Sequence, residues 1–281
     1  MSAATMPAQP VEAWSGKDRA DENFPVGVLV SRRLRPHVHA FYTFARNADD
    51  IADDAALAPE EKLARLDAMG AALDGRDMAR SPTATALRES LRATGVSTRH
   101  GHDLLVAFRQ DATKRRYADW EELLEYCRFS AMPVGRYMLE LHGESRTSWA
   151  PSDALCAVLQ VLNHLQDCAK DLAKLDRCYL PEDMLAAAGV THLAVMEPQT
   201  GHGLRRVMDQ LLDRCDEMMR EAVKLPRAVR DRRLRLETAI IIGLAQRLAR
   251  RLRRDDPLAQ RVKLSRLDVV GSAFAALRYL P

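Results

Sequence analysis

Two aspartate clusters, more than a hundred residues apart, are the groups in this chain best suited to chemistry. The first, ARNADDIADD, contains Asp49 and Asp53, and the second, NHLQDCAKDL, contains Asp167 and Asp171. Residues four apart on an α-helix share a face, about 6 Å apart along the axis, so each pair places two carboxylates side by side. Like charges at this spacing destabilise a bare helix by roughly 0.2–0.5 kcal/mol per pair, so we expect a cation to offset the repulsion. Because Mg²⁺ combines carboxylate ligands with phosphate oxygens, two facing pairs would hold a diphosphate.

The second cluster lies on the more informative of the two helices. In AVLQVLNHLQDCAKDL, Asn163, Asp167 and Asp171 follow one another at four-residue steps, with Gln160 beside them, and most of the remaining surface is apolar. A helix that is apolar nearly all round is normally buried, and carboxylates there are costly unless they face partners or a wet cavity. The alternative for each cluster is a solvated helix face. The presence of two such clusters favours the site.

The composition predicts a helical protein. The chain has 281 residues, is 47% hydrophobic and only 5% aromatic, and is rich in Ala, Leu and Arg, which favour helices. Its net charge of +3 is too small to indicate a nucleic-acid-binding protein. Five scattered cysteines without a CxxC motif predict neither a disulfide framework nor a zinc module, and they fit a reducing cytoplasm. No signal peptide is evident, and the longest apolar stretch is too short to span a bilayer.

Helical periodicity runs through the chain, with no strand pattern and no internal repeat. We expect a disordered segment over 1–20 and one all-α domain over 21–281. Ser152 is the expected N-cap of the acidic helix over 153–174. The other predicted helices cover about 35–56, two segments opened by Pro59 and Pro82, 102–113, the segment WEELLEYCRFSAMPVGRYMLELHG, 204–224, 227–254 and 265–279.

The middle helix contains residues that do not suit a helix interior. Ser130, Ala131, Pro133 and Gly135 are small or disrupt helices, and Gly costs roughly 1 kcal/mol and Pro about 3 in that position. Two explanations stay open: a kink that lines a cavity, or a close helix–helix crossing.

These residues together resemble the squalene/phytoene synthase family of head-to-head prenyl synthases, over roughly residues 22–260. The motifs are specific as a set: the two acidic clusters, FRQDATKRRY followed by EYCRFSAMPVG, and NHLQDCAKDL followed by DRCYLPEDML. Within the family, the sequence is most similar to the hydroxysqualene synthases of bacterial hopanoid biosynthesis, through ENFPVGVLVSRRLRPHVHAFYTFARNADDIADD and the Gln in NHLQDC.

The resemblance implies a single-domain isoprenoid-synthase helical bundle around a central hydrophobic cavity, with Mg²⁺ bridging the acidic motifs to a diphosphate. The residues that match the family's metal-binding positions are Asp49, Asp53, Asn163, Asp167 and Asp171. The resemblance also implies a catalytic role for these four aspartates and for Tyr42. The residues that match substrate-binding positions are Arg46, Tyr126, Gln160, Asn163, Arg177 and Tyr179. Lys114 or Arg116 would add donors.

Two departures from the family pattern bear on the reaction. Many condensing members carry a Ser-containing segment where this chain has Asn23-Phe24-Pro25-Val26, and many carry Arg where it has Gln166. Both changes suit an enzyme that ionises one large diphosphate already made.

The resemblance therefore implies Mg²⁺-dependent conversion of presqualene diphosphate and water to hydroxysqualene and diphosphate. The alternative is head-to-head condensation of two prenyl diphosphates to presqualene diphosphate, squalene or phytoene, and a remote alternative is a non-catalytic assembly factor on the same fold. The expected location is the cytoplasm, with neighbouring hopanoid-pathway enzymes as partners. The basic run Arg247–Arg254 is interpreted as an outer helix face, with peripheral contact to the inner face of the membrane as the alternative.

Overall fold

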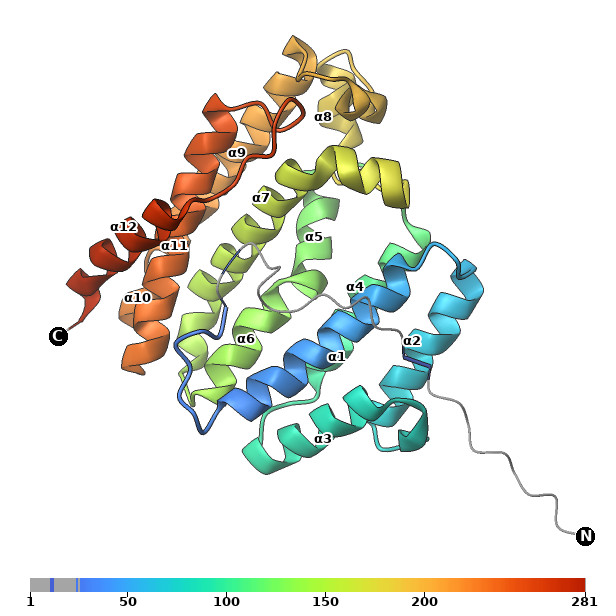
Figure 1. Cartoon of the computed structure of the whole chain (residues 1–281), viewed down its shortest axis with the longest axis vertical. Helices are drawn as coiled ribbons and strands as arrows, with labels where there is room; N and C mark the ends of the chain where they lie inside the picture. Colours follow the sequence, from blue (N-terminus) through green and yellow to red (C-terminus); the bar gives the residue numbers. More distant parts are fainter. Residues whose placement is uncertain (1–10, 13–23, 25, 281) are drawn as a thin grey trace, which may run out of the picture. The chain divides into compact units, whose positions relative to one another are not determined.

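The computed structural model describes residues 11–12, 24 and 26–280, and this part of the chain forms two compact units. One unit contains Arg32–Thr113, the other begins at Lys114, and each includes a short earlier segment. Every described element is an α-helix or a short 3₁₀ helix, which confirms the all-α class (Figure 1). Most of the segment 1–20 lies outside the described residues. The expected domain bounds stay a prediction.

The first unit is built from α1 (Arg35–Asp53), α2 (Pro59–Leu73), η2 (Met78–Arg80), α3 (Pro82–Thr94) and α4 (Arg99–Thr113). Both α1 and α2 pack against α3 and α4. Pro59 and Pro82 lie in the first turns of α2 and α3, as predicted, because proline fits where no backbone donor is needed. The core is apolar and includes Phe44, Ile51, Leu66, Met69, Leu73, Leu87, Leu104 and Leu105.

Two early residues are fixed to this unit near the start of α3. The amide of Val11 donates to Arg80 O at 2.9 Å. The Glu12 carboxylate accepts hydrogen bonds from Ser81 Oγ and Thr83 N, both at 2.7 Å. Ser81 is itself the N-cap of α3. Glu12 therefore supports that cap with charge-assisted hydrogen bonds.

The second unit is built from α5 (Trp120–Ser130), α6 (Met132–Leu141), η3 (Arg146–Ser148), α7 (Trp149–Leu175), α8 (Glu182–Ala187), η4 (His192–Met196), α9 (His202–Ala222), α10 (Leu225–Ala228), α11 (Arg232–Arg254), α12 (Arg266–Ala276) and η5 (Leu277–Tyr279). The long helix α7 packs against α5, α6, α9 and α11, so it occupies the centre of this unit. Among the residues described, no helix combines the length and the hydropathy needed to cross a membrane.

The middle helix predicted from the sequence is in fact two helices. Backbone torsions leave the helical range at Ala131 (φ −122°, ψ −46°), and α6 starts with Pro133 in its first turn. A proline inside one continuous helix would remove a backbone hydrogen bond and clash with the preceding turn. The chain avoids this cost by ending α5 at Ser130.

Gly135 marks a close crossing between α6 and α7. A Cβ at this position would lie 2.4 Å from Ser152 Oγ and 2.7 Å from Cys156 Sγ. The close-crossing explanation for Gly135 is therefore correct. The prediction that Ser152 caps the acidic helix is wrong, because α7 begins at Trp149 and Ser152 is buried inside it against α6.

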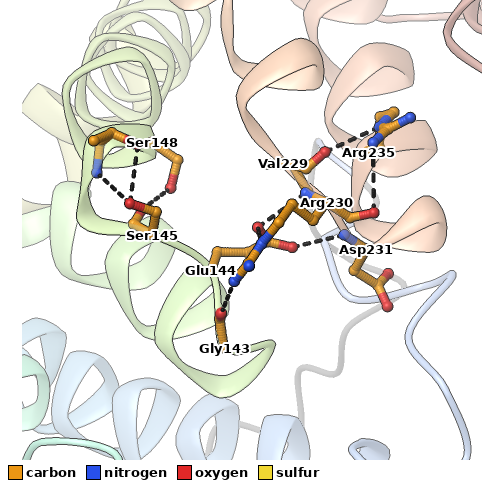
Figure 2. Close-up of polar contacts among 9 residues, drawn as sticks. Gly143, Glu144, Ser145, Ser148, Val229, Arg230, Asp231 and Arg235 are labelled. Carbon is orange, nitrogen blue, oxygen red and sulfur yellow. Dashed lines mark hydrogen bonds and ion pairs between the residues drawn. The ribbon is translucent and has the colours of Figure 1, made fainter.

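Glu144 joins the end of α6 to the start of α11 (Figure 2). Its side chain is 2% exposed, and its carboxylate accepts hydrogen bonds from the backbone amides of Arg230 at 2.9 Å and Asp231 at 2.7 Å. Arg230 also donates to Gly143 O at 2.8 Å. Asp231 in turn caps α11 by accepting from Arg233 N and Leu234 N. A buried carboxylate needs such partners, and here they orient the helix that follows.

A second buried carboxylate on α11 holds the loop that precedes α1. Glu237 is 3% exposed, and it accepts hydrogen bonds from Gly27 N at 2.5 Å and Leu29 N at 2.7 Å. Gly27 has φ of 75°, a conformation that glycine adopts without strain. The segment Asn23-Phe24-Pro25-Val26 differs from the Ser-containing segment of many condensing family members. The structure describes two of its residues, Phe24, which is buried, and Val26.

Candidate functional site

The first acidic cluster lies in the last turns of α1 and at its C-cap, Asp54. Asp50 accepts two hydrogen bonds from Arg46 at 3.1 and 2.8 Å, and Asp54 accepts one from Ala56 N at 2.8 Å. Both therefore have local structural partners. Asp49 and Asp53 lie one turn apart and are both partly exposed. They are the pair that the sequence singles out.

Asp49 lies in surroundings that disfavour its negative charge. Burial raises the pKa of Asp49 to about 8, with repulsion from Asp53 acting in the same direction. Arg46, whose guanidinium lies 3.1 Å from the Asp49 carboxylate, opposes this shift. The side chain nevertheless keeps 33% of its surface exposed. An accessible carboxylate whose charge is disfavoured in this way, with a second carboxylate one turn away, suits a divalent cation.

Two further α1 residues named from the sequence lie on the same helix. Arg46 is 12% exposed and its guanidinium contacts both Asp49 and Asp50, so it neutralises part of the acidic cluster. Tyr42 lies one turn earlier and is partly exposed. Their roles beside a diphosphate stay predictions.

The second acidic cluster forms a partly exposed stripe on α7, as the sequence predicted. Gln160, Asn163, Asp167 and Asp171 are each partly exposed. The remaining surface is largely buried through Leu155, Val158, Val161, Leu162, Leu165 and Leu172. The carboxylate of Asp167 is 27% exposed, and the nearest ammonium is that of Lys170 at 3.7 Å. A long exposed lysine at this distance offers only weak compensation for the charge of Asp167.

Beside this stripe, the second unit gathers an aromatic cluster. Tyr179 stacks on His164 with 3.6 Å between ring centroids, and it lies 5.4 Å from both Tyr126 and Tyr117. Tyr117 and Tyr126 meet edge to face at 5.4 Å. All four side chains are buried. The structure thus brings together Tyr126 and Tyr179, which the sequence named, with two residues that it did not.

His164 and Arg177 form the polar edge of this cluster. Burial, with a smaller contribution from the charge of Arg177, lowers the pKa of His164 to about 3. The imidazole is therefore neutral at physiological pH, and its Nε2 atom is buried without a hydrogen-bond partner among the described residues. Arg177 is 3% exposed and follows Asp176, which ends α7 in the left-handed conformation (φ 51°). A buried guanidinium at the end of the acidic helix suits an anionic ligand.

The two other cations considered from the sequence already have partners. Lys114 pairs with Glu122, and its ammonium lies over the Tyr117 ring at 5.0 Å. Arg116 donates to the Asp176 carboxylate at 2.7 Å. Both therefore hold the segment between Thr113 and α5 against the rest of the second unit.

Gln166, the residue that replaces an expected arginine, has a structural contact. Its amide nitrogen donates to Val262 O at 2.7 Å, which ties α7 to the segment before α12. Its Oε1 atom is buried with no hydrogen-bond partner in the described part of the chain. In this structure Gln166 therefore anchors a loop.

Each acidic pair offers oxygen donors of the kind that Mg²⁺ prefers. Within the described residues, no cluster of three or more His, Cys, Asp or Glu side chains is arranged to hold a metal unaided. A pair of carboxylates is nevertheless sufficient where phosphate oxygens complete the coordination, which is the usual arrangement for Mg²⁺. The residues present therefore fit Mg²⁺ bound together with a diphosphate.

Comparison with known proteins gives the same family. The family model described as squalene/phytoene synthase matches residues 17–268. A hydroxysqualene synthase from Rhodopseudomonas palustris is 45% identical over 95% of this chain and 91% of its own length, and one from Sinorhizobium fredii is 43% identical over 92% and 88%. The crystal structure of squalene synthase HpnC from Alicyclobacillus acidocaldarius is 32% identical and aligns with a TM-score of 0.73 over 84% of this chain and 90% of that one. The chain belongs to the squalene/phytoene synthase family.

Proposed function

We propose that this protein converts presqualene diphosphate and water to hydroxysqualene and diphosphate. One observation carries the proposal: 45% identity along 95% of the chain to a relative named hydroxysqualene synthase. The retained acidic pairs support it, since a diphosphate-releasing enzyme needs both. We place the activity in the cytoplasm, alongside neighbouring enzymes of hopanoid biosynthesis.

The diphosphate is bound by the acidic pairs and by nearby cations. Asp49 and Asp53 on one helix, and Asp167 and Asp171 with Asn163 on the other, would hold Mg²⁺. When bound, Mg²⁺ supplies positive charge that stabilises the departing diphosphate. Arg46 and Arg177 donate to the same anion, and Gln160 and Tyr42 orient it. Charge stabilisation of this kind is commonly the largest contribution to catalysis.

The hydrocarbon part of the substrate requires an apolar, π-rich surface. Breaking the carbon–oxygen bond leaves a cyclopropylcarbinyl cation, which rearranges before a water oxygen adds and one proton is lost. Tyr126 and Tyr179 present aromatic rings, whose faces attract cations. The neutral His164 adds no competing positive charge. No reductant is needed, because water supplies the hydroxyl group of the product and no hydride is transferred.

A second reading is head-to-head condensation, favoured by the likeness to a solved squalene synthase. Gln166 argues against it, because a charge-assisted hydrogen bond is worth roughly 1.5–3 kcal/mol and its loss weakens binding of a second diphosphate by about one to two decades. A non-catalytic scaffold would have no use for both acidic pairs.

Product analysis separates these functions. With Mg²⁺ and presqualene diphosphate but no NADPH, we expect hydroxysqualene and diphosphate. With farnesyl diphosphate alone, we expect little or no C30 product. Asp167→Asn should lower diphosphate release by about a hundredfold or more.

Each competing function gives a different result. Efficient formation of presqualene diphosphate or squalene from farnesyl diphosphate would assign the condensation reaction instead. Absence of any Mg²⁺-dependent diphosphate release, in a folded preparation, would leave the scaffold. Asp54→Asn is the control, since it removes a carboxylate of the same charge from the first acidic cluster, at a residue whose side chain accepts a hydrogen bond from Ala56 N.

A further inference from the structure

Helix α12, with the first residue of η5 that follows it, presents large apolar residues to solvent and small or polar residues to the protein. Leu267, Val270, Phe274 and Leu277 follow at spacings of three and four, which places them along one face, and they are 81%, 64%, 77% and 48% exposed. A surface helix normally turns such a stripe toward the core. Contiguous exposed apolar side chains mark an interaction surface.

The opposite face shows that this orientation is fixed. Asp268, Ser272 and Ala276 are buried against α11, beside which α12 lies (Figure 1). Asp268 completes a capping box with Ser265 and accepts from Arg251 at 2.6 Å. A Cβ on Gly243 of α11 would lie only 3.0 Å from Ser272 Oγ. Rotating α12 to bury its apolar stripe would break the ion pair and bring large side chains into this close contact.

Basic side chains border the stripe. Between Arg247 and Leu280 the sequence has nine basic and three acidic residues, and among these Arg251, Arg253 and Arg254 are paired with carboxylates. Arg266 and Arg278 lie at the two ends of the stripe and are exposed, as is Lys263 just before the helix. In the described residues, neither Arg266 nor Lys263 forms an ion pair. These cations are available to an anionic partner.

We infer that the exposed face of α12 docks on the surface of a bilayer that contains anionic lipids. An amphipathic helix with apolar residues on one face and basic residues at its borders lies in the plane of such an interface, with its apolar face in the acyl boundary. Each arginine near an anionic surface strengthens binding about fivefold. A second copy of this chain is a poorer occupant, because a two-fold contact through α12 would bring the same arginines together. This inference does not depend on the proposed reaction.

The test is co-sedimentation of the full chain with vesicles. Phosphatidylcholine vesicles with added phosphatidylglycerol should bind the protein, and vesicles of phosphatidylcholine alone should bind at least tenfold less. The variant Leu267→Ser/Phe274→Ser should lose at least tenfold in binding without a lower melting temperature. Arg266→Gln/Arg278→Gln should weaken binding to the anionic vesicles and reduce its salt dependence.

The matched control is Leu193→Ser/Met196→Ser on η4, where two apolar side chains are 60% and 52% exposed outside α12. It should bind like the unmodified protein. Equal loss in the control, unchanged binding of the α12 variants, or no vesicle binding by the unmodified protein would each overturn the inference. So would a dimer, seen by analytical ultracentrifugation without vesicles, that Leu267→Ser/Phe274→Ser converts to monomer.

Discussion

His164 is a buried imidazole whose neutrality has a measurable consequence for stability. Its pKa is about 3 in the folded protein, whereas an unperturbed histidine, as in the unfolded chain, has a pKa of 6.5. Between these two pH values the unfolded chain therefore binds a proton that the folded protein does not. Stability from this group is complete above pH 6.5 and is lost as the pH falls. From pH 6.5 to 5.5 the loss is about 1 kcal/mol. His164→Phe keeps an aromatic ring against Tyr179 and should remove this slope.

Urea unfolding at several pH values, with EDTA present to exclude bound metal, measures the effect. The difference in unfolding free energy between the variant and the unmodified protein should change with pH by the amount given above. A constant difference over this range would show that folding does not shift the pKa of His164.

At the residue scale, sequence motifs predict candidate site residues, whereas contacts that depend on tertiary packing are not visible in the motifs. The acidic pairs follow from four-residue spacing, and Tyr126 and Tyr179 from the family resemblance. His164 and Tyr117 lie within motifs quoted from the sequence, NHLQDC and KRRY, but only the fold stacks them with the other rings. Gln166 was interpreted as a missing cation. Its bond to Val262, 96 residues away, leaves no local pattern.

Among the elements, the crossing of α6 and α7 leaves no room at Gly135. Gly135→Ala should destabilise the protein by about 1–3 kcal/mol, because the added carbon overlaps Ser152 Oγ and Cys156 Sγ. Chemical denaturation gives the change in unfolding free energy. Gly201→Ala is the control, since nothing lies within 4 Å of a Cβ there, and it should be nearly neutral.

A compensating variant tests the stated cause. Adding Ser152→Ala and Cys156→Ala to Gly135→Ala removes the two overlapping atoms and should recover part of the lost stability. The loss of unfolding free energy in the triple variant is compared with the sum of the losses in Gly135→Ala and in Ser152→Ala/Cys156→Ala. If the two are equal, the loss at Gly135 has another origin, such as a changed backbone conformation.

Helix starts set by local signals were predictable, and interruptions set by packing were not. Proline fixes the starts of α2 and α3 by its own geometry, and these predictions are confirmed. The break at Ala131 was not predicted, because the sequence was interpreted as one middle helix that contains either a kink lining a cavity or a close helix–helix crossing. Ser152 resembles an N-cap in sequence, but burial against α6 places it within α7. A side chain's role at such a position depends on a neighbouring helix that no local pattern specifies.

On the scale of the whole molecule, each unit carries one of the two acidic pairs that the sequence singles out. Arg46 offsets only part of the repulsion around Asp49, whose pKa is raised to about 8, and Lys170 lies 3.7 Å from Asp167 on an exposed side chain. A ligand that binds only the folded state stabilises it by RT ln(1 + [L]/Kd), about 2.7 kcal/mol at a hundredfold excess over Kd. Mg²⁺ with inorganic diphosphate should therefore raise the melting temperature.

A double-mutant cycle tests whether both pairs act on one diphosphate. If they do, Asp49→Asn and Asp167→Asn should each remove most of the Mg²⁺–diphosphate-dependent rise in melting temperature, and the double variant should lose little more. The physical reason is that either change weakens the same bound complex, so the effects are coupled and not additive. Melting curves for each variant without ligand correct for changes in intrinsic stability, and Asp54→Asn should keep the full rise. Two partial losses that add up would indicate independent sites, and an undiminished rise in Asp167→Asn would exclude that carboxylate as a ligand.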